Sequence, residues 1–167
     1  TSETGKMTIQ ELKERGAIYI PNINDGFNRY RYETLRMGAQ EAGDFFRKLW
    51  KENGNENAFV DFYYFSLSKE SKQKVDSVLS EAEREYLHLW EKREYLQTRQ
   101  TEKEYRNNLR EDSENIIFAL EDMLLDIIVK LNAREMLFST FYFTKEKSTW
   151  WGNYNQEYIV FRDSISI

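Results

Sequence analysis

The clearest pattern of hydrophobic and polar positions lies in the middle of the chain. Apolar residues recur there at alternating steps of four and three, with one arginine among them: Val75, Leu79, Ala82, Tyr86, Leu89, Arg93 and Leu96. This heptad spacing predicts a helix with a coiled-coil seam over about 69–98. A second helix with its own apolar seam is predicted over 101–132. This helix begins with Thr101 and Glu104, which match a T-x-x-E capping box.

The capping box near residue 101 indicates a new helix start, so the two helices predict a long protruding antiparallel helical hairpin (69–98 and 101–132). From residue 116 onward the second helix is apolar nearly all round and should lie in the core, whereas 69–115 contains the part that should protrude. A single continuous helix over 69–132 is the alternative. The seam could be used within the hairpin or between two chains.

Shorter patterns flank the hairpin. Thr8 and Glu11 form another T-x-x-E box, and Gly16 supplies a stop signal, so a short helix is predicted over 9–15. Asp25-Gly26 lies between two extended-looking runs and predicts a β-hairpin. An apolar stripe predicts a helix over 34–52. Aromatic and β-branched runs predict strands at 58–67, 135–145 and 157–161, the last two as an antiparallel pair.

Together these elements predict an α+β fold, in which an antiparallel sheet of about 4–5 strands packs with helices and the hairpin projects from it. The length of 167 residues is that of a single domain, 1–167. The hydrophobic content of 40% and the aromatic content of 16% support a folded core, although 32% of the residues are charged.

Composition narrows the function further. The chain has no cysteine, which excludes disulfides, thiolate metal sites and cysteine nucleophiles. The formal net charge of −5 argues against a general nucleic-acid coat. The most apolar run, 116–131, contains three acidic residues, so no membrane span and no membrane partner are expected. We expect a cytoplasmic protein.

Catalytic signals are sparse. His88 is the only histidine and falls outside the heptad seam, so a Ser-His-Asp triad is not expected. No glycine-rich phosphate loop occurs, and no cofactor is predicted. Asp122 and Asp126 lie one turn apart on a polar stripe and are candidate metal or substrate ligands, in a carboxylate- or magnesium-dependent enzyme centred on 111–126. A solvated helix face explains the same two residues.

A basic stripe near the predicted tip of the hairpin gives a further alternative. Its cations share one helix face and would suit a nucleic-acid-associated factor: Arg99, Lys103, Arg106 and Arg110. Acidic residues are interleaved with them, as in an ordinary surface with ion pairs.

Aromatic residues give the leading candidates. Neighbouring strand residues point to opposite faces, so Trp150 is expected in the core and Trp151 on the outside, unless Gly152 inserts a bulge. The same alternation in the run at 29–33 places the arginines on one face and the tyrosines on the other, as at an interface, and two tyrosines that face the core explain the same pattern. The candidate partner-binding residues are Trp151, Tyr154, Tyr30, Tyr32, Arg29 and Arg31.

The leading hypothesis is therefore a non-enzymatic, intracellular protein–protein interaction module. It would be a regulator, an inhibitor, an immunity factor or a subunit of a larger complex, because aromatic and arginine side chains are the usual anchors of interfaces. Another protein is the expected partner, with a homodimer through the hairpin as one form. The nucleic-acid factor and the carboxylate enzyme are the alternatives.

Overall fold

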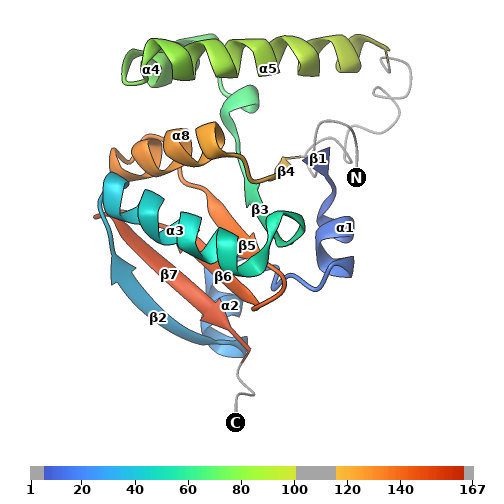
Figure 1. The fold of residues 1–167 in the computed structure, drawn as a ribbon, viewed down its shortest axis with the longest axis vertical. Helices are drawn as coiled ribbons and strands as arrows, with labels where there is room; N and C mark the ends of the chain where they lie inside the picture. Colours follow the sequence, from blue (N-terminus) through green and yellow to red (C-terminus); the bar gives the residue numbers. More distant parts are fainter. Residues whose placement is uncertain (1–5, 101–115, 164–167) are drawn as a thin grey trace.

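The structure is a computed structural model that describes residues 6–100 and 116–163, with only the backbone of 94–100. Within these residues, seven strands form one antiparallel sheet in the order β1-β4-β3-β5-β6-β7-β2 (Figure 1). The strands are β1 (Lys6–Met7), β2 (Arg31–Arg36), β3 (Ala58–Asp61), β4 (Ile117–Ala119), β5 (Thr140–Phe143), β6 (Ser148–Gly152) and β7 (Glu157–Arg162). The α+β class is confirmed, with more strands than the sequence predicted.

Helices cover the sheet unevenly. They are α1 (Ile9–Glu14), α2 (Ile23–Arg29), α3 (Ala39–Asn53), α4 (Lys69–Ser77), α5 (Glu81–Gln100) and α8 (Asp122–Ala133), with short 3₁₀ turns η1 (Asn55–Asn57) and η2 (Tyr64–Ser66). α3 and α8 lie over one face of the sheet, here called the helix face (Figure 1). α4 and α5 lie along one end of the molecule, beyond α8.

The core on the helix face is built around one side chain of α3. The Phe46 ring is fully buried and stacks on Phe141 of β5, with 4.1 Å between the ring centroids. It also meets Trp150 of β6 and Tyr158 of β7 edge-on, at 5.5 and 5.1 Å. One phenylalanine thus joins α3 to three neighbouring strands, and aromatic pairs in these geometries stabilise beyond their burial.

The segment before β2 covers the opposite face of the sheet, here called the second face. Ile18 and Ile20 pack there with Ile159 and Phe161 of β7. Nearer the other edge, Leu12 of α1 belongs to a cluster with Met7, Phe59, Ile117 and Tyr142. The second face is therefore buried by a non-repetitive chain, which leaves room between its side chains.

The tryptophan pair divides between these two faces as the alternation predicts. Trp150 is 1% exposed and lies in the core of the helix face. Trp151 packs at the margin of the cluster on the second face and is partly exposed. β6 itself lies between β5 and β7, so the prediction that 135–145 pairs directly with 157–161 is wrong. Residues 148–152 are a central strand because both of their neighbours supply ladder partners.

The predicted helical hairpin over 69–98 and 101–132 is wrong in two places. The first helix is interrupted at 78–80, because Ser80 and Glu83 form a capping box: the Ser80 N–H donates to Glu83 Oε1 at 2.9 Å, and the Glu83 N–H to Ser80 Oγ at 3.2 Å. A capping box is as strong a start signal as the heptad pattern that runs through it.

The second helix is wrong at 117–119, which form β4 between β1 and β3. An all-apolar run fits a buried strand as well as a buried helix, and here the open side of β3 provides the ladder. The predicted residues 101–115 lie outside the described part of the chain. α5 is not detached from the core, since Trp90 packs against Phe118 with 4.6 Å between the ring centroids.

The β-hairpin predicted around Asp25-Gly26 is also wrong, because 23–29 form α2. Asn22 caps this helix by accepting the Asp25 N–H at 3.1 Å. Gly26 is needed for close packing: a Cβ on it would lie 2.6 Å from the Phe161 ring. The helix predicted over 34–52 begins later, at Ala39, since 31–36 are β2.

Gly152 provides a test of this packing. A Cβ on Gly152 would lie 2.0 Å from Asn132 Oδ1 and 2.9 Å from the Ser139 carbonyl oxygen, and Asn132 is fully buried. We expect Gly152→Ala to lower the free energy of unfolding by about 1–3 kcal/mol in urea denaturation, as overpacking does. Gly43→Ala in α3 is the control, because its Cβ would meet only ordinary contacts at 3.5 Å or more; it should be neutral or stabilise by up to about 1 kcal/mol.

Candidate functional site

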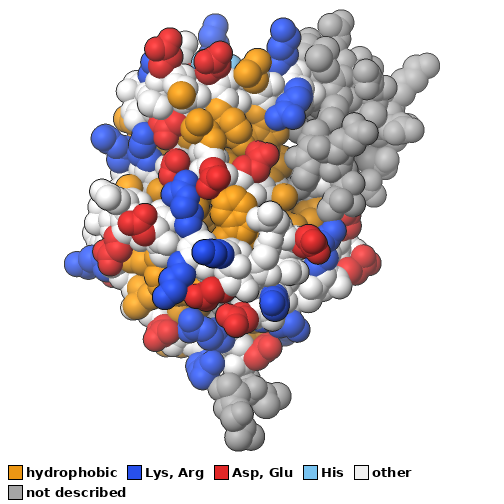
Figure 2. Space-filling view, viewed as in Figure 1, with side chains coloured by type: hydrophobic (Ala, Val, Ile, Leu, Met, Phe, Trp, Pro, Cys, Tyr) orange, Lys and Arg blue, Asp and Glu red, His pale blue; other side chains and the backbone are white. Residues whose placement is uncertain are grey.

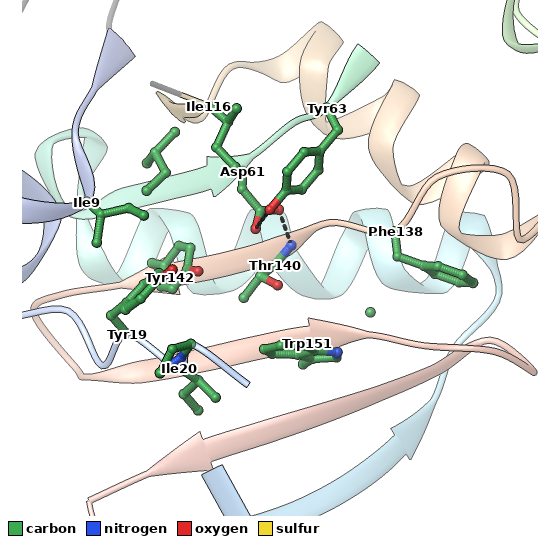
Figure 3. A pocket seen from close by; sticks show the side chains of 13 residues that line it. Ile9, Tyr19, Ile20, Asp61, Tyr63, Ile116, Phe138, Thr140, Tyr142 and Trp151 are labelled. Atoms are coloured by element: carbon green, nitrogen blue, oxygen red, sulfur yellow. Dashed lines mark hydrogen bonds between the residues drawn. The ribbon is translucent and has the colours of Figure 1, made fainter. Parts of the chain in front are cut away.

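A pocket of about 170 Å³ opens on the second face of the sheet, between the N-terminal segment and the strands β3, β5 and β6 (Figure 3). A cavity of this size has room for a small ligand or for one side chain of a partner. Its lining residues are Ile9, Tyr19, Ile20, Pro21, Asp61, Tyr63, Ile116, Ile117, Phe138, Thr140, Tyr142, Trp151 and Gly152. Pro21 and Tyr63 are exposed, so the pocket reaches the surface.

Asp61 is the chemical centre of the pocket. It is the last residue of β3, and strand alternation directs its carboxylate, like Phe59, toward the second face. The side chain is 7% exposed. Its Oδ1 accepts the backbone N–H of Thr140 at 2.7 Å, its Oδ2 has a long contact of 3.4 Å with the Tyr63 hydroxyl, and the Thr140 side chain also contributes a hydrogen bond to the carboxylate (Figure 3).

Burial raises the pKa of Asp61 from its ordinary value of 3.8 to about 7, and the hydrogen bonds from Thr140 and Tyr63 offset only part of that effect. In the described part of the chain, no lysine, arginine or histidine lies within ion-pair distance of this carboxylate. Burial likewise raises the pKa of Tyr63 and Tyr142, so both phenols stay protonated near neutral pH.

Aromatic rings form much of the wall and the mouth of the pocket. Tyr19 and Tyr142 stack with 6.3 Å between their ring centroids. Trp151 lies opposite Thr140 in the β5–β6 ladder, so its indole lines the same pocket on the far side of Thr140 from Asp61 (Figure 3). At the mouth, Phe138 contacts Tyr154 edge-on at 4.8 Å. We call Tyr63, Phe138, Trp151 and Tyr154 the aromatic rim.

This arrangement suits a hydrogen-bond donor or a cation better than an anion or a metal. The one carboxylate is incompletely paired, and aromatic faces attract positive charge. Among the residues that the structure describes, no group of three or more His, Cys, Asp or Glu side chains could hold a metal ion.

Two of the predicted partner-binding residues belong to this site. Trp151 lines the pocket and Tyr154 extends its rim through Phe138. The other four lie at the β2 edge of the sheet. Tyr32 is 53% exposed and contacts Phe27. Arg31 lines a separate hollow with Glu33 and Arg162. Tyr30 packs beside the cluster that contains Ile18, and Arg29 is the last residue of α2.

The other predicted sites are separate from the pocket. Asp122 and Asp126 both bind Arg47 of α3, at 3.2 and 2.9 Å, and this ion pair joins α3 to α8. The metal site at these two residues therefore stays a prediction. The side chains of Arg99, Lys103, Arg106 and Arg110 lie outside the described part of the chain.

The sequence analysis missed Asp61, Tyr63 and Thr140. The one signal available was a carboxylate at the end of the apolar run Ala58–Val60, where a buried strand leaves little water for a charge. Thr140 could not be identified, because its N–H reaches Asp61 across 79 residues of sequence.

Comparisons with known proteins add no family. No protein-family model matches the chain, and no curated protein or solved structure shows significant similarity to it. Among the described helices, none combines the length and apolar character needed to cross a membrane.

The pKa of Asp61 predicts an unusual dependence of stability on pH. A carboxyl group whose pKa is raised from 3.8 to about 7 by folding favours the protonated form in the native state. Its destabilising contribution is absent below about pH 4, grows up to about pH 7 and is constant above that. Asn cannot ionise, so Asp61→Asn should gain stability relative to the wild type as the pH rises from 5 to 8.

Urea unfolding midpoints of both proteins at pH 5 and pH 8 check this expectation. The difference between the two proteins isolates Asp61, because every other titrating group is shared. An equal difference at the two pH values would show that Asp61 ionises normally in the folded protein.

Proposed function

We propose that the chain is a non-enzymatic interaction module that recognises a partner protein through the pocket around Asp61. The observation that supports this function is the aromatic rim. Tyr63 lines the pocket and is 37% exposed, and Tyr154, which contacts Phe138 of the lining, is 61% exposed, so both rings are accessible to a partner.

Interface energetics favour the same interpretation. Aromatic side chains supply much contact area for few rotatable bonds, and they are enriched among the residues that dominate binding energy. Trp151 is already held by its strand neighbours, so a partner would lose little side-chain entropy in ordering it. A pocket with a polar floor and an aromatic rim would receive one anchoring side chain.

Acid–base catalysis by Asp61 is the second candidate function. A carboxyl group with a pKa of about 7 in a pocket is suited to transfer protons near neutral pH. Among the described lining residues, however, Asp61 is the single acidic or basic side chain. The other polar side chains of the lining are the hydroxyls of Thr140 and of three tyrosines, and burial keeps the phenols of Tyr63 and Tyr142 protonated near neutral pH, so binding is the favoured function.

The alternatives drawn from the sequence keep weaker support. On the face covered by α3 and α8, acidic and basic side chains are interspersed (Figure 2), so that face offers no continuous basic surface for nucleic acid. A carboxylate enzyme would have to recruit Asp122 and Asp126 away from Arg47. A homodimer through 69–132 remains a prediction.

Capture of partners from extracts of the source cells tests the proposed function. The double variant Tyr63→Ser, Tyr154→Ser should lose most of a partner that the wild type retains, because two rim contacts worth more than about 1 kcal/mol each are removed. Quantitative mass spectrometry of the captured proteins measures the ratio. Both substitutions replace exposed side chains, so the urea midpoint of unfolding of the double variant should change little.

Leu89→Ser is the matched control. Leu89 of α5 is 60% exposed, close to the exposure of Tyr154, and it does not line the pocket. Capture that is equal for the wild type and the rim variant would contradict the proposed function. Loss of the partner in Leu89→Ser alone would show that the binding surface lies on α5 and not at the pocket.

A further inference from the structure

We infer that the pocket binds the side-chain ammonium group of a lysine in the partner, with Asp61 as its counter-ion. This inference rests on the proposed function, and it adds the chemical class of the group that enters the pocket.

Asp61 is incompletely paired. Its Oδ1 accepts the Thr140 N–H and its Oδ2 has a long contact of 3.4 Å with the Tyr63 hydroxyl, so its hydrogen bonds compensate only part of the cost of burial. A buried carboxylate needs a charge partner or several good hydrogen bonds, and none of the described residues supplies the charge. A cation that enters the pocket would complete this pairing.

The walls of the pocket around Asp61 match the chemistry of a lysine side chain. Aliphatic side chains and aromatic rings surround the carboxylate on the way in from the surface, among them Ile20, Pro21 and Ile116. The lysine side chain has the matching order, with an apolar stem of four carbons and a charged tip. The Trp151 ring, which lines the same pocket, can add cation–π attraction to the ammonium group.

A lysine side chain fits the carboxylate of Asp61 better than an arginine side chain does. A guanidinium group binds a carboxylate best through two parallel hydrogen bonds, which need both oxygens. At Asp61 the Thr140 N–H already occupies one acceptor site of Oδ1, so the approach to both oxygens that a guanidinium group needs is more crowded than the approach to Oδ2. A compact ammonium group can use one oxygen together with the Trp151 ring, and it needs less of the 170 Å³ available.

Binding of an ammonium group should depend on pH, because it requires the ionised form of Asp61. The titratable groups that face this carboxylate are the phenols of Tyr19, Tyr63 and Tyr142. Two cations at the C-terminal end of α1 lie over aromatic rings of the same face, Lys13 over the Tyr19 ring at 5.3 Å and Arg15 over the Phe59 ring at 5.4 Å. Affinity is therefore expected to rise from pH 6 to pH 8.

Titration of the full chain with Nα-acetyl-lysine-N-methylamide tests the inference, with the tryptophan indole signals in NMR as the readout. The matched compounds are the norleucine analogue, which keeps the stem and lacks the charge, and the arginine analogue. We expect the lysine compound to shift the Trp151 signal, and both analogues to bind at least about tenfold more weakly.

The variants Asp61→Asn and Asp44→Asn complete the test. Asp61→Asn should weaken binding of the lysine compound roughly 10- to 100-fold, as loss of a charge-assisted hydrogen bond does. Asp44→Asn removes an exposed carboxylate of α3 and should leave the affinity unchanged. Equal binding of the norleucine compound, or full binding by Asp61→Asn, would overturn the inference.

Failure of the inference is distinguishable from failure of the proposed function. If the lysine compound causes no shift up to its solubility limit, while the rim variant still loses its partner, the lysine assignment is wrong and the interaction surface stands. If the rim variant retains the partner, the proposed function is wrong.

Discussion

The packing of Phe46 against three strands determines how the rest of the molecule is arranged. Its ring contacts Phe141, Trp150 and Tyr158, and so it fixes α3 across β5, β6 and β7 at once. α8 then packs on α3 and is secured to it by Arg47. Because these two helices fill the helix face, the remaining strand residues must be covered by the N-terminal segment on the second face.

This asymmetry accounts for the position of the pocket. Two regular helices, α3 and α8, cover the centre of the helix face, whereas the second face is covered by two short helices and the connection between them. That cover meets Ile159 at one end and Phe59 at the other, and the gap between those clusters contains Asp61 and Trp151. The carboxylate is thus deep in the fold and still accessible, a combination that raises its pKa and leaves it available to a ligand.

Local chemistry was sufficient to predict some elements but not the site. The helix at Ile9–Glu14 follows from Thr8, whose hydroxyl does accept the Glu11 N–H, and strand alternation correctly separates Trp150 from Trp151. The turn expected at Asp25-Gly26 fails because Gly26 serves a contact with Phe161, which is remote in sequence. Asp61 was missed for a related reason: its burial and its hydrogen bond come from segments that no local pattern connects to it.

β2 forms one outer edge of the sheet, and among residues 6–100 and 116–163 no strand pairs with the backbone groups on its far side. Such an edge can add strands from other molecules and so begin a fibre. Arg31, Glu33 and Arg36 are all exposed along it, and any added strand would have to remove water from these charges. Arg31, which the sequence indicates as a partner-binding residue, would then act in the opposite sense together with Glu33 and Arg36, by keeping separate copies of the chain from joining edge to edge.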